Sequence, residues 1–166
     1  MALFKSLDSG LQALGIFPSI RKFVIAVQDV TNSATFTDST ILQADLIANA
    51  TYDFQTLELI GSSAFATAGA QSQLAYTGSG TFSGTRFRGS ASNVEPVNSG
   101  PTWGGSSDSV NGAANEPSTS LLVERRGRIV TTTSGVLKVQ FRQSTAVAAH
   151  YARLSIGSYL NVQRVS

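Results

Sequence analysis

After residue 22, the chain alternates apolar and polar residues in short runs, and this period of two constrains its fold more than any other feature. Such alternation is typical of strands that bury one face. The runs cover residues 23–27, 41–46, 51–60, 74–76, 82–87, 119–124, 127–133, 135–143 and 152–165. Eight or more short strands with no convincing helix among them predict an all-β, jelly-roll-like antiparallel β-sandwich.

Two of these runs, and the segment between two others, carry more specific expectations. In 51–60 the apolar residues Phe54 and Leu57 are three positions apart instead of two, which predicts a β-bulge between them. Residues 124–128, Glu-Arg-Arg-Gly-Arg, separate two runs and predict a hairpin turn. Its three arginines, Arg125, Arg126 and Arg128, are expected to be solvated. In residues 135–143, Val136, Leu137, Val139 and Phe141 are interpreted as a nearly continuous apolar strand, as expected of one with a core on one side and an interface on the other.

Residues 1–22 follow a helical spacing instead. The stripe consists of Leu3, Phe4, Leu7, Leu11, Leu14 and Phe17. It predicts a helical turn or short helix, because Gly10, Gly15 and Pro18 limit the length of any helix here. An apolar segment of this kind must bury its stripe on its own domain or on a neighbour, and both remain open. We therefore divide the chain into an N-terminal segment, 1–22, and a sandwich domain, 23–166.

Residues 89–117 predict a long surface loop. They hold three of the four prolines and, apart from Trp103, almost no large apolar residue. Long loops within compact domains are usually functional or disordered. Trp103 either anchors the loop to the domain, or stacks on a sugar, or enters a partner's pocket.

Charge and cysteine content limit the partners. Charged residues form 13% of the chain, against roughly a quarter in typical soluble domains. A weakly charged polar surface suits a subunit of a tight assembly, because few ions lose water at a contact. The net charge of +2 is too small to predict a nucleic-acid partner. Cysteine is absent, which excludes disulfides and thiolate metal sites.

The chain contains no recognisable targeting or membrane signal. The first twenty residues hold one lysine, Lys5, but only broken apolar runs and no cleavage pattern of a signal peptide. No run approaches the roughly 18 apolar residues of a membrane span. We therefore expect a soluble protein that is made in the cytoplasm and has no membrane partner.

Candidate catalytic and metal-binding residues are scarce. His150 is the only histidine, so any Ser-His-acid triad depends on it, and a structural or interface role is the alternative. A ring of His150 side chains on a symmetry axis is a further hypothesis. The ten acidic residues are spread evenly and are interpreted as solvated single charges, although Asp108 and Glu116 could bind calcium or sugar. We expect no enzyme activity, no metal and no cofactor.

Several segments resemble a known class of protein. The first three are Asp29-Val-Thr-Asn-Ser, Ile41-Leu-Gln-Ala-Asp and Ile47-Ala-Asn-Ala-Thr-Tyr-Asp-Phe. The others are Thr132-Thr-Ser-Gly-Val-Leu-Lys-Val-Gln-Phe-Arg-Gln-Ser and Ile156-Gly-Ser-Tyr-Leu-Asn-Val-Gln-Arg-Val. The pattern is similar to small β-sandwich virion proteins of tailed bacteriophages, which occur as capsid decoration (cement) proteins and as tail-fibre or receptor-binding modules.

The resemblance implies a jelly-roll-like subunit, commonly a homotrimer, on the outer capsid surface of a virion. Its partners would be the major capsid protein and further copies of itself. The alternative it implies is a tail-fibre or receptor-binding module that recognises a host surface glycan through the loop around Trp103. On the first hypothesis residues 1–22 are an anchoring arm, and residues 23–166 form the projecting knob. The Leu/Phe stripe of the arm, together with Lys5, Arg21 and Lys22, lies on capsid subunits or on a neighbouring copy.

Overall fold

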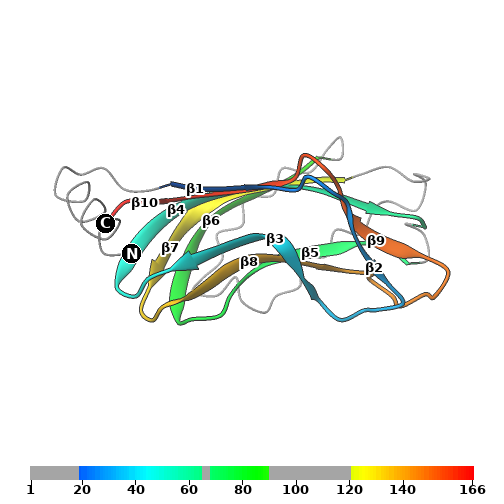
Figure 1. The fold of residues 1–166 in the computed structure, drawn as a ribbon, viewed down its shortest axis with the longest axis horizontal. Helices are drawn as coiled ribbons and strands as arrows, with labels where there is room; N and C mark the ends of the chain where they lie inside the picture. The colour runs from blue at the N-terminus through cyan, green and yellow to red at the C-terminus, as the bar shows by residue number, and fades with distance from the viewer. Residues whose placement is uncertain (1–18, 65–67, 90–120) are drawn as a thin grey trace.

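The computed structural model describes residues 19–64, 68–89 and 121–166 of the 166-residue chain (Figure 1). Every strand pairing in it is antiparallel, and the strands form two sheets. The predicted all-β sandwich is therefore confirmed. The strands are β1 Ser19–Phe23, β2 Gln28–Thr31, β3 Thr37–Leu46, β4 Ala50–Ser62, β5 Gln71–Tyr76, β6 Gly80–Gly89, β7 Leu121–Thr131, β8 Gly135–Arg142, β9 Tyr151–Leu154 and β10 Tyr159–Arg164.

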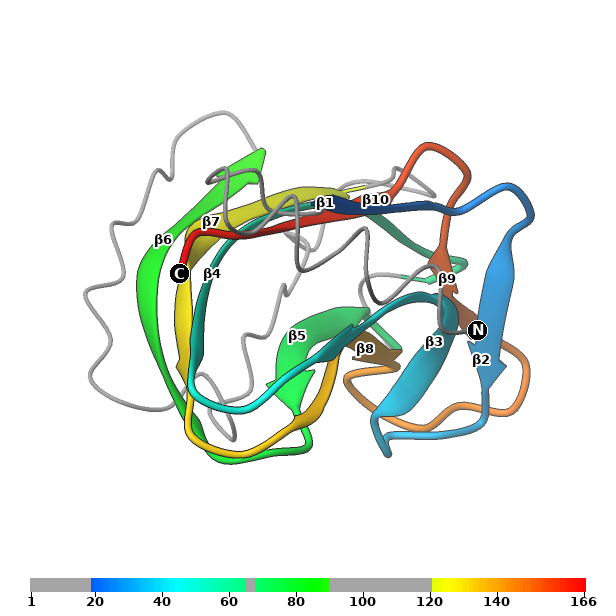
Figure 2. The ribbon, with the colours of Figure 1, turned by 60° about the vertical axis from the view of Figure 1, so that its left-hand side comes forward.

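The larger sheet has the strand order β1-β10-β4-β7-β6. At the far end of β4, residues 60–62 pair with β9, which in turn carries β2. The smaller sheet has the order β3-β8-β5. Figure 2 shows that β4, β7 and β6 curl around the smaller sheet. One face of the large sheet is therefore turned inward, and the other is turned away from the core.

The core lies between the two sheets and follows from the period of two. On β8, Leu137, Val139 and Phe141 are buried, and the residues between them are half-buried. This confirms that 135–143 faces a core on one side; the interface on its other side stays a prediction. The large sheet contributes buried side chains that include Tyr52, Phe54, Ile60, Ile129, Leu160 and Val162.

The predicted bulge in 51–60 is wrong. β4 pairs with β7 in unbroken register from Ala50 to Ile60, and its buried positions alternate without a slip. The alternation of buried and outward-facing residues continues because Thr56 and Glu58 face inward and make polar contacts there. Leu57 therefore faces the other side of the sheet. The register shift lies in β3 instead, between Asp38 and Gln43.

The predicted turn at 124–128 is also wrong. β7 runs through these residues with β4 on one side and β6 on the other, so both neighbours hold its backbone in the sheet. Arg125 is buried, contrary to expectation. Arg126 and Arg128 are exposed, as predicted.

Two further runs differ from expectation. The run 23–27 is not one strand, because β1 ends at Phe23 and the chain turns into a connection. Val24 is the buried residue there, whereas Phe23, Ile25 and Val27 are exposed. The run 152–165 is two strands, β9 and β10, joined by a turn in which Gly157 has φ +92°, a value that favours glycine.

The structure begins within the segment assigned to the arm, since residues 19–22 belong to β1. The stripe Leu3, Phe4, Leu7, Leu11, Leu14 and Phe17 lies outside the described residues. Trp103 and the predicted loop 89–117 also lie outside them, except for Gly89, the last residue of β6.

Candidate functional site

The side of the large sheet that is turned away from the core carries a mixed aromatic and polar surface, which we call the outer face. Strand register places its side chains in rows across the sheet. One row joins Phe23, Tyr159, Leu57 and Glu124, and the next joins Arg21, Asn161, Gln55 and Arg126. These side chains range from half-buried to exposed.

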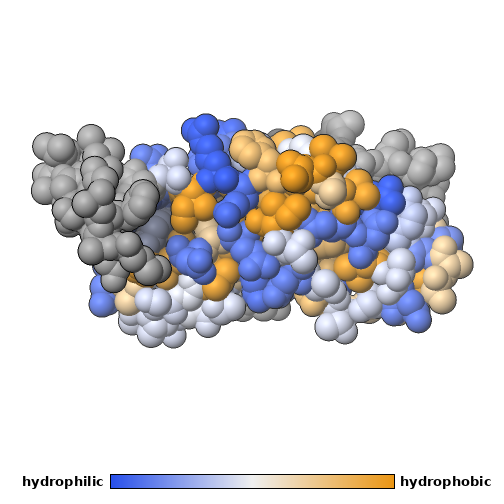
Figure 3. Space-filling model, in the orientation of Figure 1, coloured by the Kyte–Doolittle hydropathy of each residue, from blue (hydrophilic) through white to orange (hydrophobic). Residues whose placement is uncertain are grey.

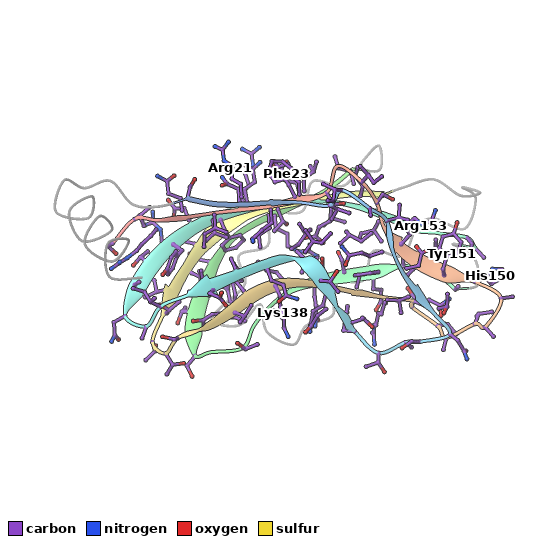
Figure 4. All side chains as sticks on the ribbon, in the orientation of Figure 1. Arg21, Phe23, Lys138, His150, Tyr151 and Arg153 are labelled. Carbon is purple, nitrogen blue, oxygen red and sulfur yellow. The ribbon has the colours of Figure 1, made fainter. Side chains whose placement is uncertain are left out.

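A hollow of about 280 Å³ lies on this face, and we call it the aromatic groove. Its lining residues are Arg21, Phe23, Gln55, Tyr159 and Asn161. The Phe23 and Tyr159 rings lie 6.0 Å apart between centroids, tilted by 50°, and Phe23 is 54% exposed. Figure 4 shows Arg21 and Phe23 projecting from β1 to the same side, away from the sheet.

The polar groups of the groove are partly committed to protein partners. Gln55 Nε2 donates a hydrogen bond to Glu124 Oε1 at 2.7 Å, which leaves the Gln55 amide oxygen as its acceptor. Asn161 Oδ1 is buried and has no hydrogen-bond partner among the described residues. Arg21 makes no ion pair with any residue that the structure describes.

Charges beside the groove are paired within the chain. Arg126 Nε donates to Glu124 Oε1 at 2.5 Å. The Arg128 guanidinium donates to both oxygens of Asp53, at 2.7 and 3.2 Å. These hydrogen bonds and the Asp53 charge raise the pKa of Arg128 above its usual value. The carboxylates of Glu124 and Asp53 are thus already paired with cations.

An aliphatic cluster lies at the end of the outer face, and we call Ile25, Val27 and Ile156 the corner patch. Their exposed fractions are 80%, 46% and 58%. Val24 N donates to Ser158 O at 2.9 Å and Gly157 N donates to Val24 O at 3.3 Å, so the connection after β1 lies beside the β9–β10 turn. Figure 3 shows hydrophobic residues gathered over this region. Exposed apolar groups of this kind are typical of interaction sites.

His150 lies at the start of β9, near Tyr151 and Arg153 (Figure 4). Its Nδ1 is 3.2 Å from Ser63 Oγ, which also accepts a hydrogen bond from Tyr151 N. A triad would need a carboxylate on the imidazole. None makes a hydrogen bond to His150 within the described part of the chain. The contact ties the end of β4 to β9, which is a structural role.

Glu58 and Arg125 form a buried ion pair that the sequence interpretation missed. Both side chains are fully buried, and Arg125 Nη1 donates to Glu58 Oε1. Arg125 Nη2 also donates to the backbone and hydroxyl oxygens of Ser72, at 2.9 and 3.1 Å. Because Ser72 belongs to β5, the pair links the two sheets. Strict alternation from Tyr52 was the signal that could have placed Glu58 inside.

The interpretation of the acidic residues as single solvated charges is therefore wrong for several of them. Besides Glu58, four carboxylates form ion pairs, and these are Asp29, Asp38, Asp53 and Glu124. Asp108 and Glu116 lie outside the described residues. Within residues 19–64, 68–89 and 121–166, no group of three or more histidines and carboxylates is arranged to hold a metal ion. The same ranges contain no helix with the length and apolar character needed to cross a membrane.

Comparison of the chain with family models, with curated proteins and with solved structures found no match.

Proposed function

We propose that this chain is a bacteriophage capsid decoration protein, which binds the outer surface of the capsid as a homotrimer and stabilises the shell. The proposal assigns it contacts with the major capsid protein and with its own copies, and no catalytic turnover or cofactor. The resemblance of residues 28–60 and 128–165 to phage virion proteins supports this function, and the β-sandwich is compatible with it.

The corner patch is the observation that carries the proposal. Full burial of an aliphatic side chain contributes about 1.5–3 kcal/mol. Ile25, Val27 and Ile156 retain much of their exposed surface, so a neighbouring subunit that covers them gains part of that free energy at each copy. Three linked copies bind a symmetric surface far more firmly than one.

A tail-fibre or receptor-binding module is the second candidate, and the aromatic groove favours it. Aromatic side chains beside convergent polar groups in a concave site are typical of small-ligand binding. The two candidates differ in copy number, because a decoration protein is present in numbers comparable to the major capsid protein and a receptor-binding module in numbers comparable to tail proteins.

Protein stoichiometry on purified particles tests the proposal, combined with thermal and low-salt challenge of particles that contain or lack this chain. We expect a copy number comparable to that of the capsid protein, and shells that rupture more readily when the chain is missing. A low copy number, with intact shells that no longer adsorb to cells, would assign the chain to receptor binding instead.

A further inference from the structure

We propose that the aromatic groove binds an acidic saccharide unit, with the aromatic rings packing on the sugar and Arg21 binding its carboxylate. The groove would do so whether or not the chain decorates a capsid. The five described residues that line it come from three strands, β1, β10 and β4, which lie side by side in the large sheet. The site is therefore held by the sheet backbone.

The aromatic rings supply the apolar part of the site. A pyranose ring presents a face of C–H groups, and such a face packs well on an exposed aromatic ring. Phe23 is more than half exposed, and its ring is tilted by 50° from that of Tyr159. The two rings therefore form inclined walls instead of a flat stack. A hollow of about 280 Å³ lies near the lower end of the usual range for ligand sites, which suits one sugar ring of a longer chain.

The amide groups supply acceptors for sugar hydroxyls. Asn161 Oδ1 is buried without a partner among the described residues. An unsatisfied buried acceptor is costly, and a ligand hydroxyl that donates to it, after the Asn161 side chain turns this oxygen toward the groove, removes the cost. The Gln55 amide nitrogen is held by Glu124, which leaves the amide oxygen as an acceptor. Two acceptors separated by one strand spacing match a polyhydroxylated ligand better than an aliphatic one.

Charge in the groove favours an acidic sugar. Among the residues that the structure describes, Arg21 is the only charged one that lines it. The neighbouring carboxylates of Glu124 and Asp53 are paired with Arg126 and Arg128, so they do not neutralise Arg21. A guanidinium binds a carboxylate through two parallel hydrogen bonds. A uronic acid unit supplies this carboxylate, and its hydroxyl groups can donate hydrogen bonds to the amide oxygens of Gln55 and Asn161.

A protein partner is the competing occupant, and the lining favours a saccharide over it. The groove is concave and three of its five residues are polar, whereas the aliphatic groups expected of a protein contact gather at the corner patch. If a second copy occupied the groove, the protein would assemble through it, and a variant of the groove would have a lower mass in solution.

The test is titration calorimetry of the full chain with three probes: an oligogalacturonate, a hyaluronan oligosaccharide and maltohexaose. The variants are Phe23→Ala and Arg21→Gln. The control is Val130→Ala, another exposed apolar residue of the large sheet that does not line the groove. Circular dichroism and the mass in solution are measured for every variant, so that a loss of fold or of assembly is separated from a loss of binding.

We expect at least one acidic probe to bind and maltohexaose to bind at least about tenfold more weakly. Phe23→Ala should weaken acidic binding by about tenfold or more, and Arg21→Gln should remove most of the preference for the acidic probe. Val130→Ala should bind as the unaltered chain does.

Any of three results would overturn the inference. The first is no heat of binding with any of the probes at millimolar concentration. The second is binding that is unchanged in both Phe23→Ala and Arg21→Gln. The third is a fall in the mass of Phe23→Ala in solution without any saccharide binding by the unaltered chain, which would identify the groove as a contact between copies.

Discussion

Glu58 and Arg125 are enclosed between the sheets with no exposed side-chain surface. Thr56 Oγ1 donates to Glu58 Oε1 at 2.7 Å, and Ser72 accepts from Arg125. A buried charge is tolerated when it is paired and hydrogen-bonded, and removal of one partner leaves the other uncompensated. The pair therefore restricts which residue can stand at either position.

We expect Glu58→Gln to lower the free energy of unfolding by about 3–5 kcal/mol, because Arg125 would keep its charge without a counter-ion. The double variant Glu58→Leu/Arg125→Met should recover most of this loss, since two apolar groups need no partner. Urea unfolding measures both. Glu124→Gln, which breaks a partly exposed pair, is the control and should cost less than about 1 kcal/mol. A loss equally small in Glu58→Gln would contradict the account.

Asp38 responds to pH in a predictable direction. Partial burial acts to raise its pKa, but hydrogen bonds from Gln140 and Lys138, together with the Lys138 charge, lower the pKa below its ordinary value of 3.8. The hydrogen bonds measure 2.6 and 2.5 Å. A carboxyl whose pKa is lower in the folded state stabilises the fold above its unfolded pKa. That contribution is lost as the pH falls through the folded value.

In Asp38→Asn, we therefore expect a smaller loss of unfolding free energy between pH 6 and pH 3 than in the unaltered chain. The difference should stay below about 1 kcal/mol, because the Asp38 side chain is 42% exposed. Urea unfolding at several pH values measures it. Asp45→Asn, an exposed carboxylate on the same strand, is the control. If Asp38→Asn lost as much unfolding free energy between pH 6 and pH 3 as the unaltered chain, Asp38 would not contribute to the pH dependence.

At the scale of elements, β6 and β7 approach each other closely at a pair of glycines. Gly84 and Gly127 are register partners. A Cβ on Gly127 would lie 2.3 Å from Ser83 O and 2.9 Å from the Phe54 ring. Phe54 packs edge-to-face on Phe82 at 5.9 Å, so the missing side chain makes room for an aromatic pair. The turn expected at Gly127 was thus a place of close strand contact.

We expect Gly127→Ala to lower the free energy of unfolding by about 1–3 kcal/mol, because the added methyl group clashes first with the Ser83 backbone oxygen and then with the Phe54 ring. Ser83→Ala, which changes an exposed residue on the partner strand, should have little effect. Thermal unfolding compares the two variants. Equal melting temperatures for Gly127→Ala and the unaltered chain would show that the strands can move apart without cost.

Strand existence was predictable at this scale, whereas strand boundaries and pairing were not. Alternation identified β4, β5, β6 and β8, because burial of one face leaves a period of two in the sequence. It failed at Glu58 and Arg125, since two charged residues in phase with the core were interpreted as a bulge and a turn. The missing information was their partner across the core, which depends on how the strands pair.

On the scale of the whole molecule, the aromatic groove brings together residues from β1, β4 and β10, which are far apart in the sequence. These residues are neighbours only because the strands pair in the order β1-β10-β4, and the alternation pattern does not predict that order. The exposure of the corner patch has a related cause. Alternation in 23–27 predicts a strand with Ile25 and Val27 on one face, but the chain leaves the sheet after Phe23 and exposes them.

The two surfaces divide the tasks that we propose. The corner patch would contact neighbouring copies, and the groove would stay accessible on the outer face. Sedimentation equilibrium of the unaltered chain, of Ile25→Asp/Ile156→Asp and of an Ile47→Asp control tests the central claim of self-assembly most directly. Ile47 is a matched control because it is 51% exposed and lies in the connection between β3 and β4.

We expect the unaltered chain and Ile47→Asp to sediment at three times the chain mass of 17.4 kDa, and the double variant to sediment as a monomer. A buried aspartate at each contact would lose its water without gaining a partner. An unaltered chain that remains monomeric at every concentration, or a double variant that assembles as fully as the control, would contradict self-assembly through the corner patch.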